Sequence, residues 1–159
     1  VTGRAGAAMA AQLATMKVTE QIDALAVMGI DPIEYLVMPR ILAAVVTVPM
    51  VAMAFNIISW AAAGFVGCNI MGLDPSVYWT QLLKTVDFID LVHCLIKSAV
   101  FGLFLAEVAC FFGFRTHGGA GAVGVATRTT VVATLLGVLV IDYLMTSILP
   151  FGIPSLRAF

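Results

Sequence analysis

The sequence predicts an all-α protein whose helices cross a lipid bilayer more than once. Of its 159 residues, 62% are hydrophobic and 11% are charged, whereas soluble domains carry about 25% charged residues. Three apolar stretches exceed the roughly 20 residues that a membrane helix needs, and they cover residues 41–73, 91–114 and 131–151. Because a helix satisfies its own backbone hydrogen bonds in lipid, we expect three complete transmembrane helices within a single domain, residues 1–159.

The composition also excludes several classes of function. The net charge is −1, so the chain lacks the broad basic field that attracts nucleic acid. Cys68, Cys94 and Cys110 are widely spaced and lie in or beside apolar runs, where cysteine usually behaves as a small hydrophobic residue. We therefore expect no nucleic-acid partner, no metal site and no disulfide framework.

Residues 1–16 are expected to form the end of a further membrane helix. They are rich in Ala and Gly, and small residues let neighbouring helix backbones approach closely in a membrane. The chain begins with Val rather than Met, and no signal-peptide pattern surrounds Arg4. We therefore expect a fragment that lacks the N-terminal helices of the intact protein.

Residues 18–28 are expected to form a short amphipathic helix on the cytoplasmic side. Their apolar side chains recur at helical spacing and share one face. These side chains are Val18, Ile22, Leu25 and Met28. The other face carries Glu20, Gln21 and Asp23, without the Lys and Arg that bind anionic lipid. This composition favours docking on a protein partner, and a helix that rests on the membrane surface is the alternative interpretation.

The first complete stretch, residues 41–73, contains no charged side chain. It is longer than a minimal span, so we expect it to tilt, to kink near Pro49, or to break around Gly64 and Gly67.

Residues 74–90 are expected to form an outer loop with a second short helix that lies along the membrane surface. The opening Asp-Pro pair is a helix-start pattern, and Tyr78 and Trp79 suit the headgroup level of a bilayer. Lys and Arg are instead concentrated in the N-terminal segment and between residues 115 and 128. By the positive-inside rule these two segments face the cytoplasm, and the 74–90 loop and the C-terminal tail face the outside.

Three ionisable side chains, Lys97, Glu107 and Asp142, lie within the expected spans. Each costs about 2.5–3.5 kcal/mol near the centre of a membrane helix, so we expect them to face protein or water. Two interpretations remain open: a polar lining of a substrate cavity, or packing contacts and snorkelling to the membrane surface. A contact between Lys97 and Asp142 on different helices is possible, whereas Lys97 and Glu107 are too far apart along one helix to pair.

Residues 119–124 match the pattern G-x-G-x-x-G of dinucleotide-binding sites. That pattern binds a pyrophosphate only where a strand turns into a helix, and here the preceding segment is a membrane span. We interpret residues 118–124 as a tight cytoplasmic connection. The sequence also lacks the P-loop pattern, so any ATP hydrolysis must take place in another chain.

Several sequence blocks extend over nearly the whole chain. The longest, residues 15–25, reads TMKVTEQIDAL, and the others are residues 3–6, 31–32, 35–37, 39–40, 118–128 and 142–143. Together these blocks resemble the MlaE permease family, which includes the YrbE-type permeases associated with Mce proteins. Members of this family usually have an acidic residue in the last Gly-rich loop, where this chain has Ala120, Gly121 and Ala122.

The resemblance implies a non-enzymatic permease subunit of an ABC transporter in the bacterial inner membrane. Such a subunit pairs with a second copy of itself, with a cytoplasmic ATPase that uses ATP and Mg, and with a periplasmic ring of MCE-domain protein. Its implied substrate is phospholipid, which moves between the inner and outer membranes of a Gram-negative envelope. The chain itself is expected to need no cofactor and to contain no catalytic residue.

The resemblance also assigns roles to particular residues. The block around residue 20 matches the cytoplasmic helix that couples the permease to its ATPase, which gives this role to Thr19, Glu20, Gln21, Asp23 and Leu25. For the substrate cavity, the polar residues on the first two complete spans are candidates, although the sequence does not assign helix faces. These candidates are Asn56, Asn69, Lys97 and Glu107.

Two functions from other classes are alternatives. In an ion-coupled secondary transporter or a channel, the three ionisable side chains within the spans would bind or relay ions. In a membrane scaffold, the chain would assemble partners without transporting a substrate. A stoichiometric ATPase partner and lipid transfer on addition of ATP would separate the ABC transporter from both.

Overall fold

The computed structural model describes residues 2–86 and 88–148, and within these residues the chain is built from helices without a strand. Three of the segments are long and apolar enough to cross a membrane, namely Ile33–Asn69, Phe88–Phe114 and Ala120–Ser147. The predicted all-α fold with three spans is therefore confirmed. The elements are α1 (Thr2–Val18), α2 (Gln21–Val27), the π-helical turn η1 (Ile33–Val37), α3 (Met38–Asn69), α4 (Pro75–Thr85), α5 (Phe88–Phe114) and α6 (Ala120–Ile148).

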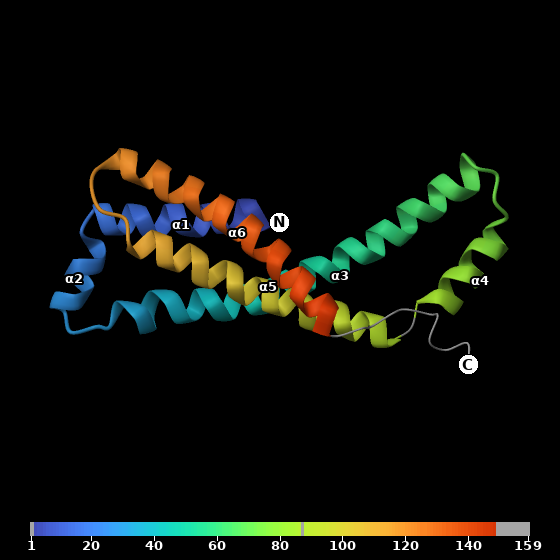
Figure 1. Cartoon of the computed structure of the whole chain (residues 1–159), viewed down its shortest axis with the longest axis horizontal. Coiled ribbons are helices and arrows are strands. Elements are labelled where there is room, and N and C mark those ends of the chain that lie inside the picture. The colour runs from blue at the N-terminus through green and yellow to red at the C-terminus, as the bar shows by residue number, and fades with distance from the viewer. Residues whose placement is uncertain (1, 87, 149–159) are drawn as a thin grey trace.

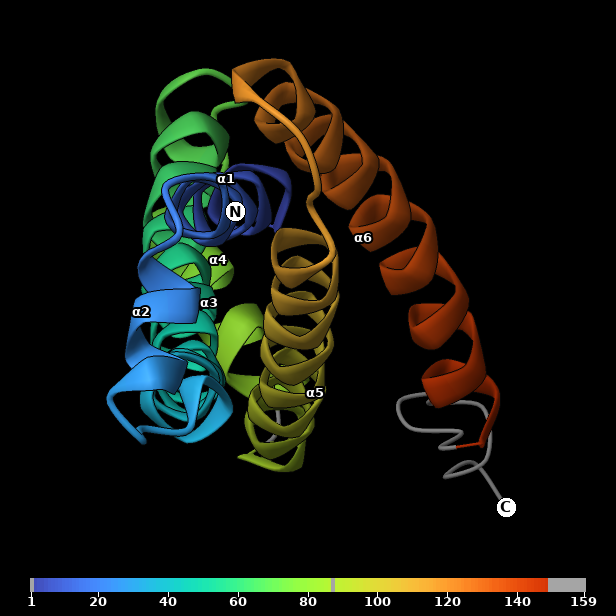
Figure 2. The ribbon, with the colours of Figure 1, turned by 90° about the vertical axis from the view of Figure 1, so that its left-hand side faces the viewer.

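The helices form an elongated bundle with a short helix at each end (Figure 1). The helix α5 is central, since it packs against α1, α3 and α6, and α1 packs against α6 as well. The view in Figure 2 shows α2 across one end of the bundle, which we call the α2 end. The opposite end, which we call the α4 end, is formed by the last turns of α3 and by α4.

Small residues on α5 bring the helix backbones into close contact. A Cβ atom added at Gly102 would lie 2.6 Å from the carbonyl oxygen of Ala44 in α3, and one added at Gly113 would lie 2.6 Å from the Cβ of Leu13 in α1. Between these two glycines, Ala106 and Ala109 are fully buried. Such stripes of small residues are typical of helix pairs in membranes, where van der Waals packing rather than water exclusion holds the helices together.

The helix α3 continues without a break through Gly64 and Gly67, so of the three alternatives expected for this span the break does not occur. The ring of Tyr78 in α4 covers Gly64, because an added Cβ there would lie 2.8 Å from its Cε1 atom. The Tyr78 hydroxyl donates a hydrogen bond to the carbonyl oxygen of Trp60 at 2.9 Å. The glycine therefore serves to seat α4, while the change in direction of α3 in Figure 1 is explained by Pro49, which lies inside the helix.

Two predicted boundaries differ from the structure. The amphipathic helix expected over residues 18–28 is α2, Gln21–Val27, because Val18 still belongs to α1 and the chain turns at residues 19 and 20. The Gly-rich connection is shorter than residues 118–124, because α6 begins at Ala120. Small residues at 121 and 124 are therefore helical, while Gly118 turns the chain with a φ of 118°. The end of the third predicted span and the C-terminal tail lie outside the described residues.

Candidate functional site

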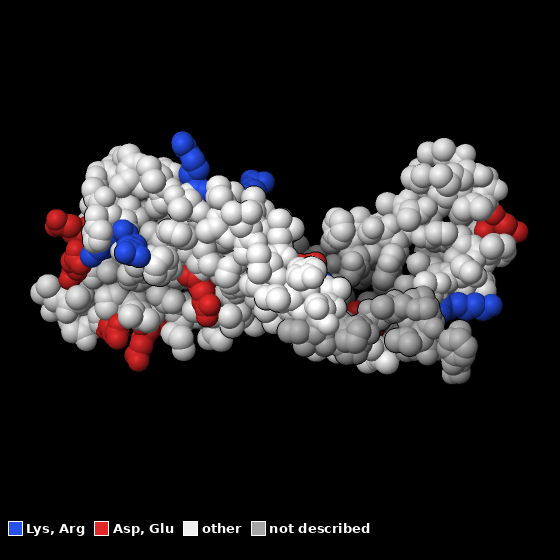
Figure 3. Space-filling model, viewed as in Figure 1, with Lys and Arg blue, Asp and Glu red and all other residues white. Residues whose placement is uncertain are grey.

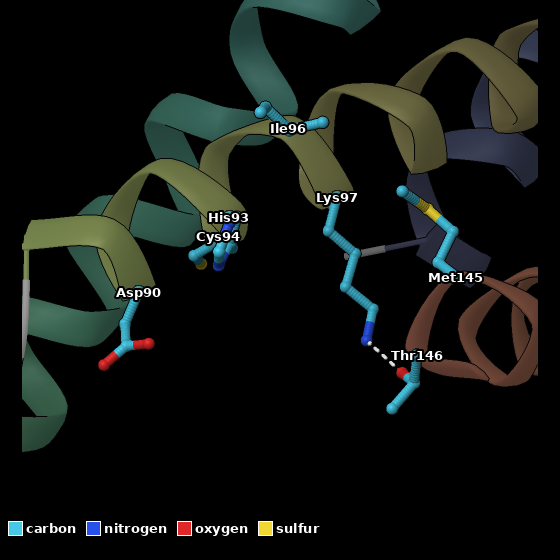
Figure 4. Close-up of a pocket in the computed structure, with 7 residues that line it drawn as sticks. All are labelled: Asp90, His93, Cys94, Ile96, Lys97, Met145 and Thr146. Atoms are coloured by element: carbon cyan, nitrogen blue, oxygen red, sulfur yellow. Dashed lines mark hydrogen bonds between the residues drawn. The ribbon is translucent and has the colours of Figure 1, made fainter. Parts of the chain in front are cut away.

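A pocket opens between α5 and α6 toward the α4 end of the bundle. Its volume is about 200 Å³. Five of the seven lining residues belong to α5 and the other two to α6, and Figure 4 shows the two helices on opposite sides of the pocket. The lining consists of Asp90, His93, Cys94, Ile96, Lys97, Met145 and Thr146.

The polar side of the pocket arises from helical spacing. Asp90, His93 or Cys94, and Lys97 follow one another at intervals of three or four residues, which places them on one face of a helix. Asp142 and Thr146 have the same spacing on α6, where the Thr146 hydroxyl donates to the carbonyl oxygen of Asp142 at 2.7 Å. Two polar stripes on otherwise apolar spans therefore meet where α5 and α6 lie together.

An ion pair joins the two stripes. The Lys97 Nζ lies 2.7 Å from Asp142 Oδ1 and donates a hydrogen bond to Thr146 Oγ1 at 3.1 Å, as the dashed line in Figure 4 shows. The side chains of Lys97 and Asp142 are 33% and 48% exposed, respectively, and Lys97 lines the pocket. Each charge is costly within a membrane helix. Because Lys97 and Asp142 contact each other, neither charge faces lipid without a partner of opposite charge.

Of the four cavity candidates proposed from the sequence, Lys97 lines the pocket and Asn56 contacts one of its lining residues. Asn56 in α3 donates from Nδ2 to Cys94 Sγ at 3.4 Å, and Cys94 and Lys97 both line the pocket. Asn69 instead lies at the last residue of α3, where it donates to the Phe65 carbonyl oxygen at 3.0 Å.

Glu107 lies on an exposed side of α5, away from the buried stripe and outside the pocket lining. Its helix position follows from the spacing: Ala106 and Ala109 on either side of it are fully buried, so Glu107 projects from a different face. The structure thus separates it from Lys97.

Apart from Lys97, the cavity candidates from the sequence did not include the residues that line the pocket, which are Asp90, His93, Cys94, Ile96, Met145 and Thr146. The repeat of polar residues every three or four positions from Asp90 to Lys97 is visible in the sequence and would have indicated a polar face on α5. The rotation of α6 that brings Met145 and Thr146 opposite that face is a property of the packed bundle.

The residues expected to couple to an ATPase lie together at the α2 end. Glu20 occupies the turn between α1 and α2 with a φ of 60° and a ψ of 13°, a left-handed conformation that costs about 1–2 kcal/mol for a residue other than Gly. Asp23 accepts a salt bridge from Lys17 at 2.7 Å, and the Thr19 hydroxyl donates to the Thr15 carbonyl oxygen at 2.9 Å. These contacts fix the direction in which α2 leaves α1.

The side chains of α2 divide into a packed face and an open face. Ile22 is 4% exposed and Leu25 packs beside it against the core cluster, while Glu20, Gln21 and Asp23 are exposed. Figure 3 shows charged side chains gathered over the half of the molecule that holds α2. The expected apolar position Met28 points outward instead, at 65% exposed, next to Val27 at 89%. The open face therefore offers apolar and acidic groups together.

Long apolar helices with charged ends and a polar pocket between two spans define a multi-pass membrane protein. Among the residues described, no group of three or more His, Cys, Asp or Glu side chains could hold a metal ion. The chain belongs to the MlaE permease family, because residues 1–148 match the family described as Permease MlaE.

Relatives of known name agree with this family. A protein of Rickettsia typhi named a probable ABC transporter permease is 38% identical over 149 residues, which cover 94% of this chain and 58% of that protein. A Synechocystis protein of the same description is 34% identical, with 92% and 56% covered. The Arabidopsis thaliana protein TRIGALACTOSYLDIACYLGLYCEROL 1, chloroplastic, is 35% identical, with 92% and 42% covered. The chain thus spans between 42% and 58% of the length of these relatives.

Proposed function

We propose that this chain is part of the permease subunit of an ABC transporter that moves phospholipid between the inner and outer membranes of a Gram-negative envelope. The observation that carries the proposal is the pocket at Lys97, which combines a cationic ammonium group with apolar walls within the membrane spans. A phospholipid has the complementary chemistry, since its phosphate is anionic and its chains are apolar. Lysine serves as a compact positive charge for phosphate.

In the proposed complex, the carboxylate of Asp142 holds Lys97 in place when no substrate is bound. A phosphate group that enters the pocket competes with Asp142 and with the Thr146 hydroxyl oxygen for the same ammonium group. Binding and release then require no acid, base or nucleophile from the chain. They require a change in the distance between α5 and α6.

The energy for this change comes from a separate cytoplasmic ATPase, which binds ATP and Mg. The open face of α2 is the proposed docking surface, with Thr19, Glu20, Gln21 and Asp23 as coupling residues, while Leu25 couples α2 to the core against which it packs. A mixed apolar and acidic surface, with Val27 and Met28 exposed beside the carboxylates, suits a protein partner better than an anionic membrane. Motion of the ATPase is passed through the turn at Glu20 to α1, which packs directly on α5 and α6.

The remaining partners follow from the same proposal. A second copy of the permease completes the membrane unit, and an MCE-domain ring binds on the periplasmic side, at the α4 end. This places the α2 end in the cytoplasm and the Lys97 pocket in the outer half of the inner membrane.

The experiment that tests the proposal uses the intact transporter purified from its native membrane. We expect an ATPase at fixed stoichiometry and transfer of labelled phospholipid to the MCE-domain partner on addition of ATP. Ion-driven flux without any ATPase would establish the secondary transporter instead. Binding of the MCE-domain partner without lipid transfer would establish the scaffold.

A double variant tests the coupling surface separately. Glu20→Lys with Asp23→Lys reverses the charge of α2, so we expect the protein to insert normally and to lose its ATPase. Glu34→Lys, an exposed carboxylate of η1 at the same end, is the control that should keep the ATPase. Full ATPase association and lipid transfer in the double variant would remove α2 from the coupling role.

A further inference from the structure

Two open grooves meet at the end of α5 that lies nearest α2. One groove, of about 380 Å³, runs between α5 and α6 along Phe112, Val125, Ala126 and Thr129. The other, of about 420 Å³, runs between α5 and η1. Its apolar walls are Ile33, Val37, Cys110, Phe111 and Phe114. Arg115 and His117 line both grooves, so two apolar channels share one polar junction.

The junction carries positive charge without a carboxylate in its lining. Arg115 is exposed, and its guanidinium carbon lies 5.5 Å from the centroid of the Phe111 ring. Neither the ion pair Lys17–Asp23 nor the ion pair Lys97–Asp142 involves Arg115. Glu34 of η1 and Glu107 of α5, carboxylates on two of the elements that form the grooves, are exposed and line neither groove.

The junction lies at the height of a bilayer surface. The 27 residues of α5 make a helix of about 40 Å at 1.5 Å per residue, whereas the hydrocarbon core is about 30 Å thick. The Arg115 end of α5 therefore reaches the headgroup level. Ala126 and Thr129, which lie two to three turns into α6, reach the upper part of the acyl chains.

From this arrangement we infer that the junction of Arg115 and His117 binds an anionic phospholipid of the adjacent leaflet, with its phosphate at the junction and one acyl chain in each groove. Arginine forms paired hydrogen bonds with phosphate oxygens, and basic pockets between membrane helices are known recognition sites for anionic headgroups. The two grooves match the two chains of a glycerophospholipid. In the proposed orientation this leaflet is the cytoplasmic one, opposite to the Lys97 pocket.

This site differs from the Lys97 pocket in what its occupant does. The Lys97 pocket lies between two spans that must separate to release a substrate, while the grooves at Arg115 join the ends of α5, α6 and η1 on the outside of the bundle. A lipid there holds these three elements together. Its occupancy therefore does not require that phospholipid is the transported substrate.

The test measures lipid retention by native mass spectrometry of the intact complex without ATP. The probes are dioleoyl phosphatidylglycerol, which is anionic, and dioleoyl phosphatidylcholine, which is zwitterionic. The background carries Lys97→Ala, which removes the other cationic pocket. In that background we expect Arg115→Gln with His117→Gln to weaken phosphatidylglycerol binding about tenfold or more, a change of about 1.4 kcal/mol, and to leave phosphatidylcholine binding unchanged.

Two further variants separate a lipid site from general damage. Arg128→Gln removes an exposed arginine of α6 that lines neither groove, and we expect it to bind phosphatidylglycerol like the parent. Thr129→Trp fills the groove against α6 without a change of charge, and we expect it to weaken both lipids.

Three outcomes would overturn the inference. Equal phosphatidylglycerol binding by the double variant and its parent would show that the junction binds no lipid. Complete displacement of the lipid by inorganic phosphate would show a site for a free anion. Loss of the ATPase with unchanged lipid retention would show a protein contact. Since the assay needs no ATP, a failure of lipid transfer with normal retention would count against the proposed function alone.

Discussion

Two lysine–aspartate pairs in this molecule have the same length and opposite surroundings. Lys17–Asp23 joins α1 to α2 at 2.7 Å, with side chains 23% and 60% exposed. Lys97–Asp142 joins α5 to α6, also at 2.7 Å, with side chains 33% and 48% exposed. The first lies at the charged α2 end and the second lies within two membrane spans. We therefore expect loss of the Lys17–Asp23 pair to change the free energy of unfolding little, and loss of the Lys97–Asp142 pair to change it more.

The difference comes from what surrounds each charge when the contact is broken. At the α2 end, water solvates a lone Lys or Asp, so a pair of this kind contributes about 0–1 kcal/mol. Within a span, a lone charge faces hydrocarbon or a small pocket, at a cost of about 2.5–3.5 kcal/mol near the helix centre. Distance alone thus does not rank the two pairs.

The largest expected effect is on the pair within the spans. Asp142→Leu leaves Lys97 without its carboxylate, so we expect the free energy of unfolding in detergent or bilayer to fall by about 2–3 kcal/mol. Adding Lys97→Met should recover most of this loss, because both charges are then absent. A single variant as stable as the parent protein would show that the pair lies outside the low-dielectric region.

Next in size is the effect on transport. Lys97→Ala removes the ammonium group proposed to bind phosphate, so we expect ATP-driven phospholipid transfer to fall about tenfold, equivalent to about 1.4 kcal/mol. Arg128→Ala, on the exposed side of α6 and outside the pocket lining, is the matched control and should transfer lipid normally. Unchanged transfer by Lys97→Ala would assign Lys97 to snorkelling rather than to the cavity.

A smaller effect is expected at the turn beside the other pair. Glu20→Gly removes the cost of a left-handed conformation in a residue with a Cβ, partly offset by the greater backbone entropy of Gly in the unfolded chain. We expect the protein to become about 0.5–1 kcal/mol more stable, as measured by thermal unfolding. A loss of stability would mean that contacts of the Glu20 side chain outweigh the strain.

The smallest effect is expected for the pair at the α2 end. Asp23→Asn keeps the size of the side chain and removes its charge, and we expect a change in unfolding free energy of at most about 1 kcal/mol. The change should shrink further at high salt, because exposed charges are screened. If Asp23→Asn lowered the free energy of unfolding as much as Asp142→Leu, the two pairs would contribute equally to stability, contrary to this prediction.

Much of the fold was predictable because hydrophobicity acts over whole segments. Residues 41–73 and 91–114 each contain more residues than a helix needs to cross the hydrocarbon core of a bilayer. Within lipid, a helix satisfies all the backbone hydrogen bonds of such a segment. The start of α4 was also predictable, since Asp74 caps it by accepting from the Ser76 backbone N–H at 3.2 Å. These features depend on residues that are close in the chain.

The site was only partly predictable, because it depends on helix rotation. The sequence allowed a Lys97–Asp142 contact, but spacing alone did not show that Glu107 would project away from the pocket. The left-handed Glu20 was not predictable either, because residue type favours Gly at such a position. The junction at Arg115 arises where three separate elements meet, which spacing along the chain does not reveal.

The contact of Gly102 with the backbone of Ala44 limits how the bundle can work. Two helices that are in contact through main-chain atoms cannot slide along each other without first separating. We therefore expect α3 and α5 to move together as one rigid unit. In the proposed transport cycle, the movement between helices therefore takes place where α6 crosses α5.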